Sequence, residues 1–317
     1  MRSLVPACAL LVCVTNHYPQ SAISNRPADA VRLGVLGIGG RYEIASMPLE
    51  TYVARVLAGE AARDSPPAAL EALAIAIRTY ALANRNRHRA EGFNLCDQTH
   101  CQVPRASTAA TERAAAVTAS QVLLDRGVPA SVFYSASCGG RTEKPSAVWP
   151  GAVDPPFLPA KKDNACDGEP AWQADLTDGD LLRSLQAAGF RGHRLKRLRI
   201  RSRTESRRVA KLEIEGLTPD VISAQDLRAA VGRALGWQYI RSTAFDLKRD
   251  GGIYRFSGRG SGHGVGMCVI GSVRLAEHGG TAKAILSRYY PGLRIGLVQS
   301  PVFSSPSPPA SYQQMPR

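Results

Sequence analysis

The chain has 317 residues, of which 44% are hydrophobic, and this is enough apolar material for a globular fold with a sizeable core. Its formal net charge of +14 at pH 7 favours an acidic partner, such as nucleic acid, an anionic membrane or an anionic wall polymer. No zinc-finger or RNA-recognition signature accompanies the charge, so we expect no nucleic-acid partner. A basic surface that binds nothing is the alternative.

Residues 1–24 have the pattern of a signal peptide. Arg2 precedes an apolar run over residues 4–14, and Ala22 and Ser24 are small residues near the expected cleavage point. The run is too short to span a membrane, and no later segment reaches about 18 unbroken apolar residues. We therefore expect an exported protein, located in the periplasm, cell wall or extracellular space, without a transmembrane segment in the mature chain.

Helices and hairpins alternate through the first half of the chain. Residues 31–46 predict a strand, a glycine turn and a second strand, and residues 48–62 predict a helix with one apolar face. The next helix, at about 67–86, is rich in alanine and apolar nearly all round, so it should be a buried central helix. A further helix at about 107–119 leads into a hairpin within 121–137, whose turn is Arg-Gly.

The second half predicts a smaller inserted, mainly β subdomain at about 165–250. Its alternating segment 194–216 predicts a basic hairpin whose arginines form either a polymer-binding face or a solvated edge, and 222–237 predicts a helix. Residues 300–317 are rich in proline and serine and should be disordered. We expect an α+β fold over 30–296, with mixed helices and antiparallel sheet around a central cleft.

His263 stands in the most distinctive segment, GRGSGHGVGM at 258–267, which holds five glycines in ten residues. Glycine is used where the backbone passes close to another group or takes a positive φ. A histidine held in this way is expected to face a cleft, although an incidental histidine in a glycine-rich turn has the same pattern.

Five cysteines lie beyond the expected signal peptide. In an exported protein they can oxidise in pairs, which leaves one over. We expect a disulfide between Cys138 and Cys166, with Cys268 free and buried, although spacing alone does not determine connectivity.

Three sequence blocks stand out together along the chain. They are 48–60 followed by 76–81, then 134–143 with 148–149, and finally 260–267 with 289–292. In order and spacing they resemble the SpoIID/LytB family (stage II sporulation protein D and the amidase enhancer). The resemblance covers about 30–296, and 239–247 is also similar to the family's segment before its Gly-His-Gly block.

The resemblance implies lytic cleavage of peptidoglycan glycan strands, with Glu60 as the catalytic acid. A glycosidic oxygen is a poor leaving group, and a carboxyl with a raised pKa can protonate it and then act as base. The sugar's own 6-hydroxyl attacks C1 in this reaction, so no second carboxylate and no cofactor is required. Two alternatives stay open: a non-catalytic wall-binding protein that stimulates an N-acetylmuramoyl-L-alanine amidase, and a basic polymer-binding protein with no enzymatic partner.

The same resemblance supplies a set of expected substrate-binding residues. Arg78 would orient Glu60 or bind a substrate carboxylate, or form a structural ion pair, because a lone buried charge is costly. A hydrolase pairing of Ser135 with His263 has no nucleophile-elbow pattern to support it. Leu73 stands where the family has glutamine, and Cys268 where it has serine, which favours the non-catalytic alternative. The expected set is Arg78, Tyr80, Tyr134, Ser135, Ser137, His263 and Gly264.

The loop after the central helix has metal-ligand chemistry. Some family members hold zinc with one histidine and two cysteines in this region, which here would be His88, Cys96 and Cys101, with His100 close by. A Cys96–Cys101 disulfide in an oxidising compartment, or two free thiols, are the alternatives. Zinc at this place would be structural rather than catalytic.

Overall fold

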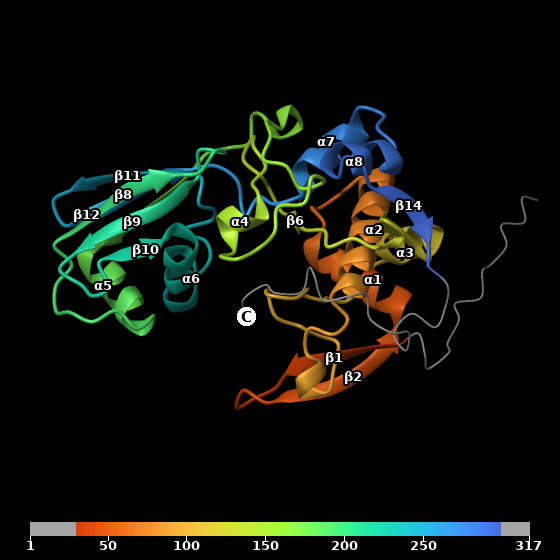
Figure 1. Ribbon diagram of the computed structural model, residues 1–317, viewed down its shortest axis with the longest axis horizontal. Helices are drawn as coiled ribbons and strands as arrows, with labels where there is room; N and C mark the ends of the chain where they lie inside the picture. The colour runs from red at the N-terminus through yellow and green to blue at the C-terminus, as the bar shows by residue number, and fades with distance from the viewer. Residues whose placement is uncertain (1–29, 299–317) are drawn as a thin grey trace, which may run out of the picture.

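The structure is a computed structural model that describes residues 30–298. The expected signal peptide at 1–24 and tail at 300–317 lie outside the described residues. Figure 1 shows a larger unit, which holds both ends of the described chain, beside a smaller unit formed by its middle part. Helices mix with mostly antiparallel sheets, which confirms the α+β class. Between residues 30 and 298, no helix has the length and apolar character needed to cross a membrane.

The larger unit begins with the predicted hairpin, which is confirmed. Strands β1 (Ala30–Leu36) and β2 (Tyr42–Pro48) pair antiparallel over their full length. Gly39 and Gly40 take positive φ in the turn between them, a conformation that favours glycine. The two-residue strand β3 (Leu95–Cys96) joins β1 in parallel, so the sheet brings the cysteine-bearing loop back to the start of the chain.

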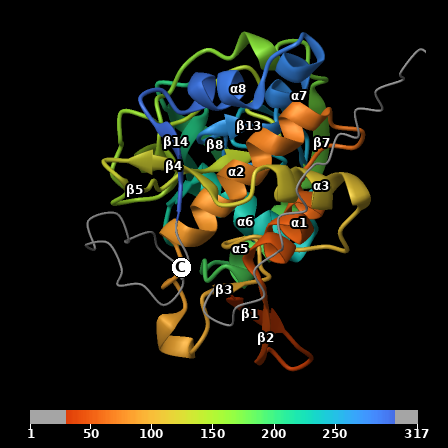
Figure 2. The ribbon, with the colours of Figure 1, turned by 90° about the vertical axis from the view of Figure 1, so that its right-hand side faces the viewer.

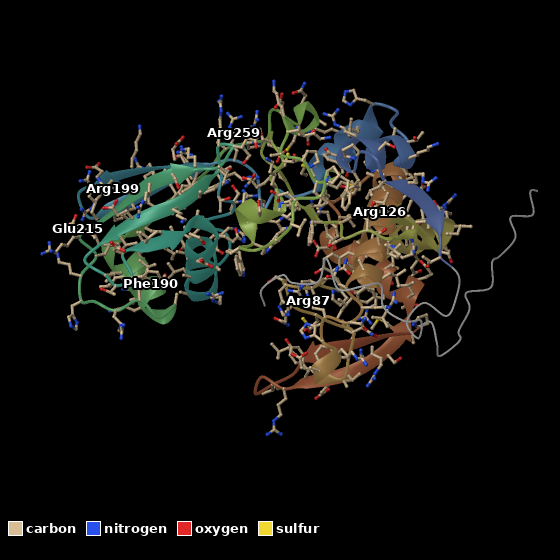
Figure 3. All side chains as sticks on the ribbon, viewed as in Figure 1. Arg87, Arg126, Phe190, Arg199, Glu215 and Arg259 are labelled. Carbon is tan, nitrogen blue, oxygen red and sulfur yellow. The ribbon has the colours of Figure 1, made fainter. Side chains whose placement is uncertain are left out.

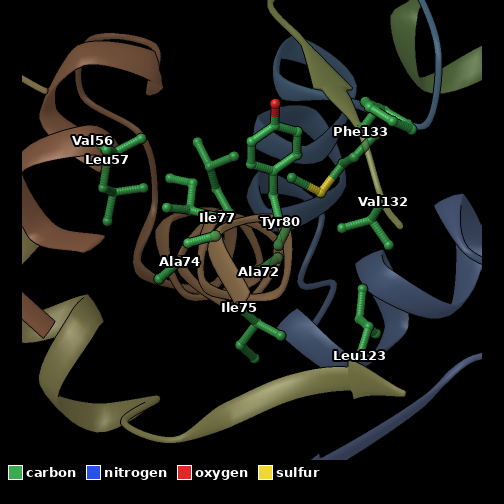
Figure 4. Packing of buried hydrophobic residues seen from close by; sticks show 14 of the residues in the cluster. Val56, Leu57, Ala72, Ala74, Ile75, Ile77, Tyr80, Leu123, Val132 and Phe133 are labelled. Carbon is green, nitrogen blue, oxygen red and sulfur yellow. The ribbon is translucent and has the colours of Figure 1, made fainter. Parts of the chain in front are cut away.

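Helix α2 (Pro67–Ala83) is the buried central helix that the sequence predicts. Figure 4 shows its side chains pointing in all directions, with Ile75 and Ile77 on different sides and Tyr80 near Phe133. Helix α1 (Leu49–Glu60) packs on α2 through one apolar face. Helix α3 (Ala109–Val117), whose N-terminus is capped by Thr108, packs on both.

The end of the chain completes the core of the larger unit. Figure 2 shows α7 (Val269–Glu277) and α8 (Ala282–Tyr289) on one side of α2, with α1 on the other. Strand β14 (Arg294–Leu297) pairs with β4 (Gln121–Asp125), which forms the predicted hairpin with β5 (Val128–Pro129) through a turn of two positive-φ residues, Arg126 and Gly127. Strand β6 (Tyr134–Ser135) and strand β13 (Met267–Cys268) pair in parallel, and a short helix α4 (Pro145–Val148) follows β6.

The smaller unit spans 172–258 and has a hydrophobic core of its own, which runs from Trp172 to Phe256. The predicted hairpin at 194–216 and helix at 222–237 are both present. Two three-stranded antiparallel sheets, ordered β10-β9-β8 and β11-β12-β7, pack with two helices. The elements are β7 (Trp172–Thr177), α5 (Asp178–Ala187), β8 (Arg197–Arg203), β9 (Val209–Glu215), β10 (Val221–Ser223), α6 (Ala224–Ala234), β11 (Phe245–Asp250) and β12 (Ile253–Gly258).

The arginines of β8 are partly neutralised by acidic neighbours. Arg199 pairs with Glu213 at 2.7 Å, and Arg203 pairs with Asp246 at 2.5 Å. Figure 3 shows Arg199 and Glu215 at the outer part of the smaller unit, whereas Arg259 lies near its junction with the larger unit. The free positive charge is therefore expected nearer the junction than on the outer strands.

Candidate active site

Glu60 is the last residue of α1, and its carboxyl is half-buried. Burial raises the pKa of Glu60 above its ordinary value. Two contacts act in the opposite direction: the carboxyl accepts a hydrogen bond from the backbone N–H of Val103 and lies near the guanidinium of Arg105. The loss of water outweighs both of them. A Cβ on the preceding Gly59 would lie 2.3 Å from the carbonyl oxygen of Val103. The close packing of this loop on the helix end therefore requires glycine.

A chain of neutral polar groups lies beside Glu60. The hydroxyl of Tyr52 donates to Gln102 Oε1 at 2.9 Å, and Gln102 Nε2 donates to the hydroxyl of Tyr134 at 2.9 Å. Burial, together with the charge of Glu60, raises the pKa of Tyr52, Tyr80 and Tyr134, so all three stay protonated at physiological pH. The carboxyl of Glu60 therefore has neutral hydroxyl and amide groups on one side, and Arg105 is the positive charge near it.

Gln102 is a residue that the sequence analysis missed. It is 1% exposed and joins two tyrosines that lie 82 residues apart in sequence. Nothing in its local sequence distinguishes it, because it belongs to an irregular loop without periodicity. Leu73, where the family has glutamine, is 1% exposed and belongs to the hydrophobic core. An amide is therefore present in this region although position 73 is apolar.

His263 packs in an aromatic setting rather than in open solvent. Its ring centroid lies 5.0 Å from that of Trp149 and 6.3 Å from that of Phe133. Burial lowers the pKa of His263 to about 3, helped by the positive charges of Arg228 and Arg208. Its Nδ1 accepts the N–H of Val265 at 3.0 Å, so the neutral ring carries its proton on Nε2.

The backbone of Tyr134 hydrogen-bonds to His263, while the hydroxyl of the same tyrosine contacts Gln102. Tyr134 thus connects the surroundings of Glu60 to the glycine-rich block. The prediction that His263 lines the same site as Glu60 stays a prediction.

Arg78 forms the structural ion pair that the sequence analysis left open beside a role in orienting Glu60 or binding substrate. It is fully buried and forms a bidentate ion pair with Glu50. Its other donors reach the hydroxyl of Thr118 and the backbone carbonyls of Ala115 and Gln121. The guanidinium therefore has no exposed surface for a ligand, and its carboxylate partner is Glu50 rather than Glu60.

Ser137 and Gly264, which were also expected to bind substrate, are buried against other residues of the protein. Ser137 is 4% exposed, and its hydroxyl lies 3.3 Å from Cys166 Sγ. Gly264 is buried with φ +80°, and a Cβ there would lie 2.3 Å from a nitrogen of Arg208. Both residues shape the interior and do not line a free surface.

Ser135 and Tyr80 differ in what they contact. Ser135 is buried, and among the described residues its hydroxyl has no hydrogen-bond partner, so it forms no hydrogen bond with His263. The hydroxyl of Tyr80 donates to the carbonyl of His100 at 3.3 Å, which links α2 to the cysteine-bearing loop.

The residues expected to hold zinc come together with a fourth ligand. The donor atoms of His88, Cys96, His100 and Cys101 all lie within 4.8 Å of one another. Cys96 Sγ is 3.2 Å from His100 Nε2, and Cys101 Sγ is 3.4 Å from His88 Nε2. Two nitrogen and two sulfur donors suit tetrahedral zinc, and no disulfide joins the two cysteines.

His88 carries the supporting contact that such a site needs. Its Nδ1 lies 3.1 Å from Glu91 Oε2, on the 3₁₀ turn Arg89–Glu91, which directs Nε2 toward the cysteines. Hydrogen bonds from Cys101 and His100 lower the pKa of Cys96 to about 4, so the cluster already favours one thiolate. The residues therefore fit a structural zinc ion.

The expected disulfide between Cys138 and Cys166 is not formed in the structure. All five cysteines within residues 30–298 are free, including Cys268, which is fully buried as expected. The three sulfur atoms of Cys138, Cys166 and Cys268 lie within 4.8 Å of one another. The sequence analysis paired two of these residues because it had no means of placing the third beside them.

A basic pocket lies at the junction of the two units. Its volume is about 540 Å³, and it is bounded by the turn at 138–141, the tip of the β8–β9 hairpin and strands β11 and β12. No spacing pattern in the sequence predicts it, because its walls come from segments that are far apart in the chain. The arginines that line it are Arg141, Arg203, Arg207, Arg208 and Arg259.

Comparison with known proteins matches the two parts of the chain separately. The stage II sporulation protein (SpoIID) family model matches residues 39–124, and a domain of unknown function (DUF8618) matches residues 156–266. The first range contains Glu60 and the four-ligand cluster. The second contains the whole of the smaller unit.

Similar proteins cover most of the chain. Stage II sporulation protein D of Bacillus subtilis (strain 168) is 27% identical over 311 residues, which is 87% of this chain and 84% of that protein. An uncharacterised protein of Brachyspira hyodysenteriae is 29% identical over 259 residues, covering 80% of this chain and 67% of that one. The Amidase enhancer of Bacillus subtilis is 27% identical over 275 residues, but these are 71% of this chain and only 37% of that protein.

These matches, together with the α+β fold, support the resemblance that the three sequence blocks predicted. The chain is similar to the SpoIID/LytB family, by the family model over residues 39–124 and by relatives of 27% identity over most of its length. This similarity supports a function connected with the cell wall.

Proposed function

We propose that the protein is an exported lytic transglycosylase that cleaves peptidoglycan glycan strands with Glu60 as general acid and base. The observation that supports this most directly is the half-buried carboxyl of Glu60, whose raised pKa suits a proton donor. Resemblance to the family at this position would not be sufficient support. An ordinary surface glutamate at a helix end is hydrated and ionised at neutral pH, so it has no proton to donate.

The chemistry needs only this one acid. Protonated Glu60 donates its proton to the glycosidic oxygen as the bond to C1 breaks, and the resulting carboxylate then takes the proton of the sugar's 6-hydroxyl as that oxygen attacks C1. The product is a 1,6-anhydro ring, and Glu60 regains its proton. The groups of Tyr52, Gln102 and Tyr134 beside Glu60 are neutral, so they add no positive charge to that of Arg105, which lowers the pKa of Glu60.

The basic pocket at the junction gives the proposal a place for the charged parts of the wall polymer. Arginine donors match the planar geometry of carboxylates, and stem peptides carry such groups. The cluster of His88, Cys96, His100 and Cys101 would bind zinc in a structural role, fixing the loop that carries Gln102 and Val103 against Glu60.

The test is mass spectrometry of purified glycan strands after incubation with the protein. We expect products with 1,6-anhydro ends from the wild type and none from a folded Glu60→Gln variant. Products with reducing ends would indicate hydrolysis instead. Cleavage that continues unchanged in the variant would remove Glu60 from the mechanism.

The alternative is that the protein stimulates a separate N-acetylmuramoyl-L-alanine amidase. The likeness to the Amidase enhancer favours it, as do Leu73 and Cys268, which replace polar family residues. The discriminating experiment adds the protein to such an amidase and measures stem-peptide release. Equal stimulation by the wild type and Glu60→Gln, without 1,6-anhydro products from either, would favour this alternative.

A further inference from the structure

A second cluster of metal-ligating side chains lies apart from the one around His88. Its cysteines come from three segments: Cys138 follows β6, Cys166 ends the 3₁₀ turn Asn164–Cys166, and Cys268 lies in β13. All three are at most 1% exposed, and their sulfur atoms lie within 4.8 Å of one another. Tetrahedral ligands of zinc are separated by about 3.5–3.8 Å, so the sulfurs need little movement to share one ion.

Backbone N–H groups point at these sulfur atoms. Cys268 Sγ accepts the N–H of Cys138 at 3.2 Å and the N–H of Gly271 at 3.3 Å, and the second of these belongs to the first turn of α7. Cys166 Sγ accepts the backbone N–H of Gly140 and contacts the hydroxyl of Ser137. Such donors stabilise thiolates, which are the form of cysteine that binds metals.

A buried carboxylate, that of Asp163, lies beside one of the three sulfur atoms. Its carboxylate is 1% exposed, and Oδ2 lies 3.3 Å from Cys138 Sγ. The hydroxyl of Tyr289 donates to Oδ2 at 2.8 Å, and Arg288 donates to Oδ1 at 3.1 Å. A Cβ on Gly271 would lie 3.0 Å from Oδ2 and 2.1 Å from the Tyr289 hydroxyl, so glycine is needed for this packing.

The guanidinium of Arg208 is buried beside the three cysteines, where a negative charge would stabilise it. Arg208 is 1% exposed and donates to the carbonyl of Cys138 at 2.6 Å, whereas its Nε and Nη1 have no hydrogen-bond partner among residues 30–298. Glu143 contributes negative charge from nearby, but in the part of the chain that the structure describes its carboxylate forms no ion pair with Arg208 and instead accepts hydrogen bonds from Thr204 and Ser206. Three neutral thiols would leave this guanidinium poorly compensated, since a buried charge without a counter-charge is costly.

We propose that Cys138, Cys166, Cys268 and Asp163 form a second zinc site. Zinc with three thiolates and one carboxylate carries two negative charges, which Arg208 and Arg288 balance. A disulfide would instead use two sulfurs, leave the third alone and provide no charge for Arg208. The site does not depend on the proposed cleavage reaction, and the sequence departs from the family pattern at Cys138 and Cys268.

The site would join the two units of the molecule. Its ligands belong to the larger unit, but Arg208 immediately precedes β9 in the smaller one. Metal binding keeps the cysteines as thiolates, and their negative charge attracts Arg208. Because Arg208 belongs to the tip of the β8–β9 hairpin, this attraction holds the tip against the larger unit. Zinc loss should loosen this junction while leaving each hydrophobic core intact.

The test measures metal content in the full chain, purified without chelator or reductant. The double variant Cys96→Ser/Cys101→Ser removes the first cluster, and adding Cys268→Ser to it removes one proposed ligand of the second. We expect about one zinc ion per chain in the double variant and a near-complete loss in the triple variant. Serine at position 268 can still accept the two N–H bonds, and circular dichroism checks that each variant folds.

A second measurement keeps the proposal testable if the double variant does not fold. Cys268→Ser alone should then lower the zinc content of the wild type by about one ion per chain. With cobalt bound in place of zinc, the sulfur-to-metal charge-transfer absorption should weaken, and the remainder should come from Cys96 and Cys101. Copper in place of zinc, an unchanged zinc content, or a Cys138–Cys166 disulfide found by non-reducing peptide mapping would each overturn the proposal.

Discussion

Helix α1 carries a glutamate near each end, and the two carboxyl groups have very different surroundings. Glu50, in the first turn, forms a bidentate ion pair with Arg78 and accepts the N–H of Ser120. Glu60, about 15 Å further along the helix, forms no ion pair with any of the described residues, and its pKa is raised by burial. The comparison teaches that the buried Arg78 gives Glu50 a structural role. Glu60 has no such partner, so its carboxyl can hold a proton and release it.

The largest expected effect is that of Glu60→Gln on glycan cleavage. The amide keeps the size of the side chain and can accept the N–H of Val103, but it has no proton of suitable acidity. We expect a loss of turnover of at least about a hundredfold, the lower range for general acid catalysis. The rate of 1,6-anhydro product formation measures it, and thermal unfolding of the variant should be unchanged.

Glu50→Gln should have the opposite pattern. It leaves the buried guanidinium of Arg78 without its counter-charge, and we expect a loss of about 3 kcal/mol in the free energy of unfolding, at the low end because glutamine still accepts one hydrogen bond. Urea unfolding measures this loss. Activity per folded molecule should be retained.

The matched control for Glu50→Gln is Glu277→Gln, at the exposed end of α7, which should change stability by no more than about 0.5 kcal/mol. Equal stabilities for the two variants would mean that the Glu50–Arg78 pair does not hold the helices together.

The pH dependence of activity gives a subtler distinction between the two carboxyls. Glu60 must be protonated to act as the acid, and burial raises its pKa above the ordinary 4.5, so activity should fall only at a pH above the usual range of a glutamate. Because its folded-state pKa is raised, the stabilising contribution of Glu60 is also present at low pH and is lost as pH rises through that pKa. A cleavage rate that falls at the pH where an ordinary glutamate titrates would argue against a raised pKa for Glu60.

The smallest effect concerns Arg105, whose charge lowers the pKa of Glu60. Arg105→Gln should move the alkaline limb of the rate profile to higher pH and leave the stability nearly unchanged, because the side chain is exposed. The control is Arg55→Gln, which removes a positive charge from α1, the helix that carries Glu60. A limb that moves down in pH, or moves equally in both variants, would contradict the assignment of the limb to Glu60.

Elements with a clear period or a definite turn signal could be predicted from the sequence. The central helix was evident because it is apolar on all sides, and the Arg126-Gly127 turn because glycine there permits the required φ. The candidate acid, Glu60, was found through resemblance rather than through periodicity. The first metal cluster was recognisable because its ligands lie within fourteen residues, from His88 to Cys101.

The parts that could not be predicted depend on contacts between distant segments. Cys268 lies 130 residues from Cys138, so no spacing reveals that they meet. Gln102 gains its role only because α1 and β6 converge on one loop. The partner of Arg78 was undetermined because either end of α1 offers a glutamate, and only packing decides which one the guanidinium reaches.

The pairing of Trp172 with Gly258 has a consequence for how the protein is made. These residues open and close the smaller unit, and they are hydrogen-bonded neighbours, so the unit has all its strands once residue 258 has left the ribosome. The larger unit must wait for α7, α8 and β14, which are synthesised last. Domains generally fold as they emerge. The middle of this chain is therefore expected to reach its native state before its beginning does, so α2 must pass through synthesis with one apolar side uncovered.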